Sequence, residues 1–263
     1  MARAILCPRC RKLIGSNESV CSWCGTARSA PLWHVLGWAK GTMGGDSVVK
    51  ALITVNIFYY AISLLTGMSG GLLSPPQGSL MVLGATGTVP MNYYGGFWTL
   101  LTASYLHGGI LHLLFNMAAL YQLGPWVVKE YGASRMLVIY TLGGVCGYLV
   151  SYVAGVQFTI GASAAVCGLA GSLLFYGKNR GGSYGSAVYQ QLSGWVISIF
   201  IFGLLFPGIN NWAHGGGLVG GALLGMLLGY MEKRKENLFH SALALLFVAV
   251  TIIALFRSVL KLI

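Results

Sequence analysis

The stretch AHGGGLVGGALLGMLLG, residues 213–229, decides the fold of this chain. Behind His214 it carries glycine at four-residue intervals, at Gly217, Gly221, Gly225 and Gly229. A matching series of small residues follows Ser163 and consists of Ala164, Gly168 and Ser172. Small residues at this spacing let two helix backbones approach closely in lipid. The two stretches therefore predict a tightly packed helix pair that has Ser163 and His214 at matching ends.

The composition of the whole chain indicates a membrane protein. Of its 263 residues, 56% are hydrophobic and 8% are charged, and the mean hydropathy is +0.73. A soluble domain of this length could not bury so much apolar surface. Apolar stretches long enough to span a bilayer, about 17–25 residues each, can be placed at 48–66, 106–124, 134–156, 161–177, 192–207, 212–230 and 239–259. We therefore expect an all-α polytopic membrane protein.

The distribution of basic residues predicts the orientation of these helices. Of the 16 lysines and arginines, all but Arg257 and Lys261 lie before or at the very start of the first apolar segment, or in or at the edge of the even-numbered connections. The positive-inside rule then places the N-terminus in the cytoplasm and the C-terminus outside. Nucleic-acid binding is the alternative explanation for a net charge of +11. Because the basic residues are dispersed over several segments, we expect no nucleic-acid partner.

A separate module is expected at the N-terminus. Two C-x-x-C pairs, ten residues apart, are formed by Cys7, Cys10, Cys21 and Cys24. Four thiolates at this spacing predict a closed tetrahedral site for structural zinc. Disulfides are the alternative, but they seldom persist in the cytosol, where the charge pattern places this segment. We therefore expect a zinc ribbon over residues 1–30 with an unknown partner, a linker near the membrane surface over 31–47, and a membrane domain over 48–259.

Three polar positions fall at a common depth in the membrane. Ser163 is 15 residues from Lys178, or about 22 Å along a helix, in a hydrocarbon core about 30 Å thick. Similar estimates place His214, and His112 with Asn116, in the half of the membrane that lies away from the basic loops. A serine can instead bond its own helix backbone, and a single histidine can be a packed polar residue. Because these costly groups converge, we favour hydrolysis inside the membrane.

Three motifs in order resemble those of the rhomboid intramembrane serine proteases. They are H-x-x-x-x-H-x-x-x-N at 107–116, G-x-S-x at 161–164 and A-H-x-x-G-x-x-x-G at 213–221. The resemblance implies a six-helix bundle, here with a seventh C-terminal helix, in a bacterial inner membrane. It implies that Ser163 attacks peptide bonds in or near transmembrane segments of single-pass proteins, that His214 is the base, and that no cofactor serves catalysis. It also implies an oxyanion hole formed by His112, Asn116 and the backbone N–H of Ser163.

The resemblance has further implications and two departures. It makes 67–97 an external loop partly in the outer leaflet, and 192–206 a lateral gate for substrate helices. Where many members have Trp-Arg, this chain has Trp98-Thr99, and Cys167 replaces a usual aromatic residue. A noncatalytic relative that binds transmembrane clients is the main alternative. A small-solute transporter is a third possibility, which the absence of an inverted repeat disfavours.

Overall fold

A computed structural model of the chain describes residues 4–6, 12–15, 18, 20–24, 45–66, 71, 73–94 and 96–262. The chain divides into two compact units, Met1–Gly44 and Gly45–Ile263.

The first unit contains a β-hairpin. Strand β1 (Ala4–Leu6) pairs antiparallel with β2 (Leu13–Gly15), with Ile5 opposite Ile14. The indole N–H of Trp23 donates a hydrogen bond to the carbonyl of Leu13 at 3.1 Å. The turn that carries Cys21 and Cys24 is therefore attached to the hairpin. Of the four expected zinc ligands, Cys7 and Cys10 lie outside the described residues, in the connection between the two strands.

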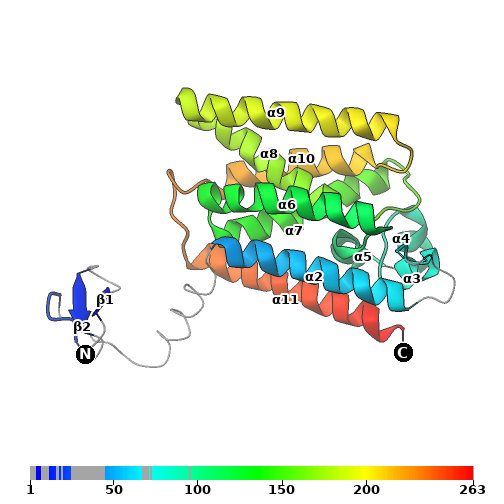
Figure 1. Cartoon of the computed structure of the whole chain (residues 1–263), viewed down its shortest axis with the longest axis horizontal. Helices are drawn as coiled ribbons and strands as arrows, with labels where there is room; N and C mark the ends of the chain where they lie inside the picture. Colours follow the sequence, from blue (N-terminus) through cyan, green and yellow to red (C-terminus); the bar gives the residue numbers. More distant parts are fainter. Residues whose placement is uncertain are drawn as a thin grey trace. The chain divides into compact units, whose positions relative to one another are not determined.

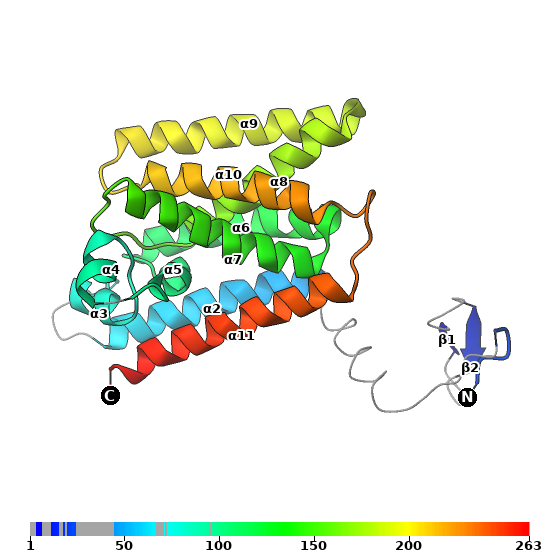
Figure 2. The same cartoon turned by 180° about the vertical axis from the view of Figure 1, so that it is seen from behind.

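The described part of the second unit is built from helices. The long ones are α2 (Gly45–Leu65), α6 (Ile110–Tyr131), α7 (Ala133–Val153), α8 (Ser163–Arg180), α9 (Gly182–Leu205), α10 (Asn211–Leu228) and α11 (Leu238–Leu260). They run side by side, with α9 along one edge of the bundle and α2 and α11 along the other (Figures 1 and 2). Short helices gather at one end of the bundle: α3 (Gln77–Val82), α4 (Thr88–Tyr94), α5 (Thr99–Thr102) and the 3-10 helix η1 (Ala103–Tyr105).

Five of these helices are long and apolar enough to cross a membrane: α2, α6, α7, α9 and α11. The remaining long helices, α8 and α10, each have 18 residues; α10 is rich in glycine, and α8 combines glycines with several polar side chains. Both lie among the other helices of the bundle (Figure 1). Most residues of α8 are buried, and a helix that is covered by protein needs fewer large apolar side chains than one that faces lipid. Helix α10 is covered on one face only, and Trp212, Val219 and Leu227 are exposed on it.

The predicted close packing of the serine and histidine helices is confirmed. A Cβ atom added to Gly221 of α10 would lie 1.8 Å from the carbonyl oxygen of Gly168 in α8. A Cβ atom added to Gly171 of α8 would lie 1.9 Å from the carbonyl oxygen of Leu218 in α10. At these positions the two backbones touch, so any side chain larger than hydrogen would force them apart.

Two sequence-based boundaries were wrong, and one expected loop contains short helices. The segment 106–124 overlaps a helix that begins only at Ile110 and continues through Pro125 to Tyr131, because transmembrane helices tolerate an internal proline. The segment 192–207 belongs to a helix that begins at Gly182, where Gly185 packs directly against Gly177 of α8. The expected loop at 67–97 contains the short helices α3 and α4.

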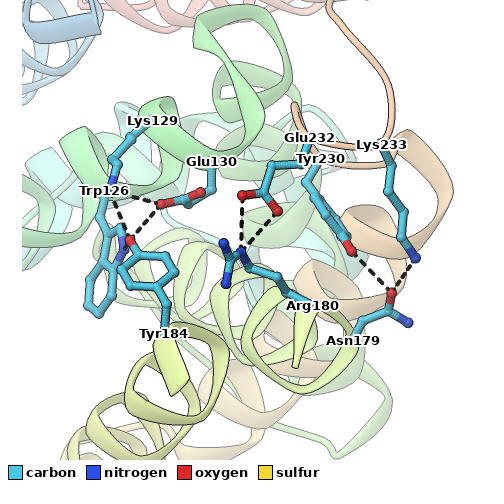
Figure 3. A network of polar contacts seen from close by, with 9 residues as sticks. All are labelled: Trp126, Lys129, Glu130, Asn179, Arg180, Tyr184, Tyr230, Glu232 and Lys233. Carbon is cyan, nitrogen blue, oxygen red and sulfur yellow. Dashed lines mark hydrogen bonds and ion pairs between the residues drawn. The ribbon is translucent and has the colours of Figure 1, made fainter. Parts of the chain in front are cut away.

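A polar network joins several helices at the end of the bundle opposite α3–α5 (Figure 3). The buried carboxylate of Glu130 accepts a hydrogen bond from the hydroxyl of Tyr184 at 2.7 Å and lies 3.4 Å from Lys129 Nζ. The guanidinium Nε of Arg180 donates to both oxygens of Glu232, at 3.0 and 2.9 Å. This network fixes α6, α8, α9 and the connection after α10 to one another, and basic residues gather at this end.

Candidate active site

Helix α8 begins at Ser163, directly after a backbone turn at Gly161. Gly161 has φ +122°, in the region that favours glycine. A Cβ atom at this position would lie 2.6 Å from Nε2 of His112 and 3.8 Å from Oγ of Ser163. The hydroxyl of Ser163 and the ring of His112 therefore border the same small space, which a side chain at position 161 would fill.

The segment that leads to Ser163 is held from two sides. Thr86 and Thr159 exchange backbone hydrogen bonds of 3.1 and 2.7 Å, and the N–H of Gly161 donates to the carbonyl of Ala103 at 2.9 Å. The hydroxyl of Tyr148, from α7, donates to the carbonyl of Gly161. The position of Ser163 thus depends on the short helices at the end of the bundle as well as on α7.

His214 lies in the first turn of α10 and is 6% exposed. Its ring packs edge-on against the ring of Phe200 from α9, with 6.4 Å between centroids. Its Nδ1 atom is buried and has no hydrogen-bond partner among the described residues. In a Ser-His-Asp triad this nitrogen would donate to a carboxylate. Among the described residues, no carboxylate accepts a hydrogen bond from Nδ1 of His214.

Ser163 and His214 are brought to the same place on α7. A Cβ atom added to Gly147 would lie 2.8 Å from the Cβ of Ala164 and 2.4 Å from the carbonyl oxygen of Ala213. These contacts involve the immediate neighbours of Ser163 and His214. Within the described part of the chain, the two side chains form no hydrogen bond with each other. Such bonds are often long in ligand-free sites and tighten when substrate binds.

His112 and Asn116, on α6, differ in how they face the serine. The backbone N–H of Gly108 donates to Nδ1 of His112 at 3.3 Å, so a neutral ring carries its proton on Nε2, the atom beside Gly161. The His112 ring is thus set to donate toward the space next to Ser163. The side-chain amide of Asn116 instead donates to the carbonyl of His112 at 2.8 Å.

Several residues at this site carried no signal that sequence reasoning could use. Tyr148, Phe200 and Asn210 are single polar or aromatic residues without a marked spacing. Asn210 caps α10 by accepting from the N–H of Ala213 at 3.1 Å. His107 is fully buried, and its ring centroid lies 5.1 Å from that of His112. His107 could have been found, because it stands in the same motif as His112.

Comparison with known proteins gives a consistent result. The Rhomboid domain family matches residues 94–231, a little over half of the chain. The chain is 36% identical over 135 residues to "Rhomboid protease GluP" of Bacillus subtilis (strain 168), covering 51% of this chain and 27% of that protein. It is 34% identical over 165 residues to "RHOMBOID-like protein 7" of Arabidopsis thaliana, covering 61% of this chain and 52% of that protein.

A third relative is "RHOMBOID-like protein 4" of Arabidopsis thaliana, 33% identical over 159 residues. The aligned part covers 60% of this chain and 40% of that protein. The chain therefore spans between about a quarter and a half of these relatives' own lengths. The region 94–231 that matches the family includes both the serine and the histidine helices, and the chain is an integral membrane protein that belongs to the rhomboid family.

Proposed function

We propose that this chain is an intramembrane serine protease that hydrolyses peptide bonds in or near transmembrane segments of single-pass membrane proteins. Ser163 is the nucleophile and His214 is the base. The observation that carries this proposal is the meeting of α8 and α10 on Gly147 of α7, with Ser163 and His214 at adjoining positions. The protease names among the relatives support it.

The reaction follows from the positions of the side chains. Because Nδ1 of His214 is buried, Nε2 receives the proton of the Ser163 hydroxyl as Oγ attacks the scissile carbonyl. The negative charge that develops on the carbonyl oxygen is stabilised by Nε2–H of His112 and the backbone N–H of Ser163. Asn116 joins them when its amide leaves the His112 carbonyl. His214 then protonates the leaving amine, and water hydrolyses the acyl-enzyme.

The membrane topology that suits this reaction has seven spans. We include α8 and α10 because each carries a reacting side chain at one end and packs closely against α7. The basic end of the bundle, with Arg180 and Lys129, faces the cytoplasm together with the N-terminus. The C-terminus and the reacting side chains then lie toward the outer face of a bacterial inner membrane, and lipids surround the bundle.

Substrate helices reach the site beside α9. Of the most apolar 18-residue stretch of α9, only 17% is buried within the protein, whereas 56% of the corresponding stretch of α7 is buried. Near the site, α9 is held to α10 by the amide of Asn211, which donates to the carbonyl of Phe200 at 3.2 Å. At its other end α9 is fixed by Tyr184 in the network of Figure 3. A helix fixed firmly at one end and lightly at the other can admit a substrate near His214.

The N-terminal unit binds one structural zinc ion through Cys7, Cys10, Cys21 and Cys24. The attachment of the Cys21–Cys24 turn to β2 through Trp23 supports this proposal, because a zinc ribbon needs its two C-x-x-C turns close together. A site filled by four thiolates has no position left for a substrate. Its role is to fold this short unit, and catalysis uses no cofactor.

The test of function uses the full chain reconstituted in lipid with a fluorogenic transmembrane substrate. Ser163→Ala and His214→Ala should each abolish cleavage, and Ser163→Ala should also abolish labelling by a fluorophosphonate. Ser198→Ala is the matched control, because Ser198 is an exposed helix serine whose hydroxyl donates to its own helix backbone, at the carbonyl of Gly194. If Ser163→Ala cleaves at the normal rate, the assignment is wrong. If the wild-type chain binds the substrate without cleavage or labelling, it is a noncatalytic client-binding member of the family.

A further inference from the structure

We propose that Arg257 and Lys261, at the C-terminal end of α11, hold the indole ring of Trp98 and thereby position the segment that presents Ser163. This gives the seventh helix a role in the active site. The catalytic part of the inference rests on the proposed protease function, whereas the structural part can be tested without it.

The contacts that carry the proposal are two cations against one ring. Lys261 Nζ lies 4.5 Å and Arg257 Cζ 5.7 Å from the centroid of the Trp98 ring, within the range of cation–π attraction. These two residues are the exceptions to the charge asymmetry of the sequence. Residue 99, beside the tryptophan, is an uncharged and buried threonine. The end of α11 supplies the positive charge that the sequence next to Trp98 lacks.

The tryptophan also packs against the loop that precedes it. A Cβ atom added to Gly84 would lie 2.7 Å from Cζ3 of the Trp98 ring, so the ring lies directly against the backbone there. The hydroxyl of Tyr59, from α2, donates to the neighbouring carbonyl of Leu83 at 2.8 Å. Trp98 thus contacts both the end of α11 and the backbone at Gly84.

A short chain of contacts runs from Trp98 to the nucleophile. The next residue, Thr99, donates its hydroxyl hydrogen to Oγ1 of Thr86 at 3.0 Å. Thr86 exchanges two backbone hydrogen bonds with Thr159. Thr159 lies four residues before Ser163, in the segment that ends in the turn at Gly161. If Trp98 is held less firmly, the hydroxyl of Ser163 should therefore also be held less firmly, although α11 itself does not reach the serine.

The test removes the two charges and measures both ends of this chain of contacts. In the Arg257→Gln/Lys261→Gln double variant, the backbone amides of Thr86 and Thr159 should exchange hydrogen with solvent faster than in the wild-type chain. Fluorophosphonate labelling of Ser163 should slow by about 5- to 30-fold, the size expected for two exposed cation–π contacts. The charge-preserving variant Arg257→Lys/Lys261→Arg should behave like the wild-type chain.

Two controls separate positioning from a general effect of charge or folding. Lys178→Gln/Lys235→Gln removes two exposed lysines at the other end of the bundle and should change neither measurement. In a Trp98→Leu background, removing Arg257 and Lys261 should cause no additional slowing, because the ring they hold is gone. Unchanged amide exchange in the double variant, or equal slowing with and without Trp98, overturns the inference. If the wild-type chain is not labelled at all, the protease proposal fails. The proposal that Arg257 and Lys261 hold Trp98 is then decided by amide exchange alone.

Discussion

The side-chain amide of Asn210 donates a hydrogen bond to the hydroxyl of Thr159 at 3.0 Å. The same amide nitrogen lies 2.6 Å from Oγ of Ser151 in α7. Asn210 is also the N-cap of α10, and its backbone carbonyl accepts from the N–H of His214 at 3.1 Å. One residue therefore connects the start of the histidine helix to the segment that leads into the serine helix.

This connection predicts that Asn210→Ala lowers both stability and reactivity. The substitution removes a helix cap, worth about 1 kcal/mol, and the bonds to Thr159 and Ser151, each of similar size. Fluorophosphonate labelling of Ser163 should slow because the two helix starts are no longer tied together.

Asn237→Ala is the matched control for this variant. Asn237 caps α11 by accepting from the N–H of His240 at 3.3 Å, at the end of the bundle away from Ser163. Thermal unfolding in detergent should register the loss of a cap in both variants, whereas only Asn210→Ala should alter the labelling rate. Equal labelling in the two variants would show that Asn210 acts only as a cap.

Gly161→Ala should abolish most activity because the new Cβ atom would lie 2.6 Å from the His112 ring. The displacement of His112 or of Ser163 by about 1 Å can cost on the order of 100-fold in rate. Gly155→Ala provides the control: its φ is +80°, and nothing lies within 4 Å of its added Cβ atom. Both substitutions place a side chain at a positive φ and should therefore lower stability, but only Gly161→Ala adds a clash with His112. A Gly161→Ala enzyme that cleaves as fast as Gly155→Ala would contradict the shared space between His112 and Ser163.

The contact between α8 and α10 predicts that Gly221→Ala prevents correct folding. Its Cβ atom would lie 1.8 Å from the backbone oxygen of Gly168, and a backbone atom cannot move aside as a flexible side chain can. Gly194→Ala in α9 adds a methyl group where nothing lies within 4 Å, so it should stabilise the helix by about 1 kcal/mol. The yield of monodisperse protein and its unfolding temperature compare the two. Normal yield and stability of Gly221→Ala would show that the helices lie further apart.

The membrane helices could be predicted from the sequence because lipid imposes a length and a composition on each span. The pairing of α8 with α10 could be predicted because small residues recur along one face of each helix. The start of α9 could not, since its first turns around Tyr184 are not apolar and are stabilised by Glu130 and Gly177, distant residues that no local pattern reveals.

Only part of the candidate site could be predicted from the sequence. Ser163, His214 and His112 stand out because polar side chains are costly in lipid, and the structure gathers them at one end of the bundle. Asn210, Tyr148 and the cations of α11 act through contacts across the chain. Their side-chain types are common at helix ends and interfaces, so only the fold shows what they touch.

Metal analysis tests the N-terminal unit independently of the membrane site. The purified chain should contain about one zinc ion, and Cys21→Ser should lose it because three thiolates hold zinc far less well than four. Residues 1–30 should then become sensitive to added protease, since metal binding supplies the folding energy of such short units. Cys146→Ser, which removes a thiol from α7, should keep its zinc. Ser163 should be labelled at the wild-type rate in the Cys21→Ser variant, because the metal takes no part in the reaction. Zinc-free wild-type protein would refute the ribbon, and loss of labelling together with zinc would refute its purely structural role.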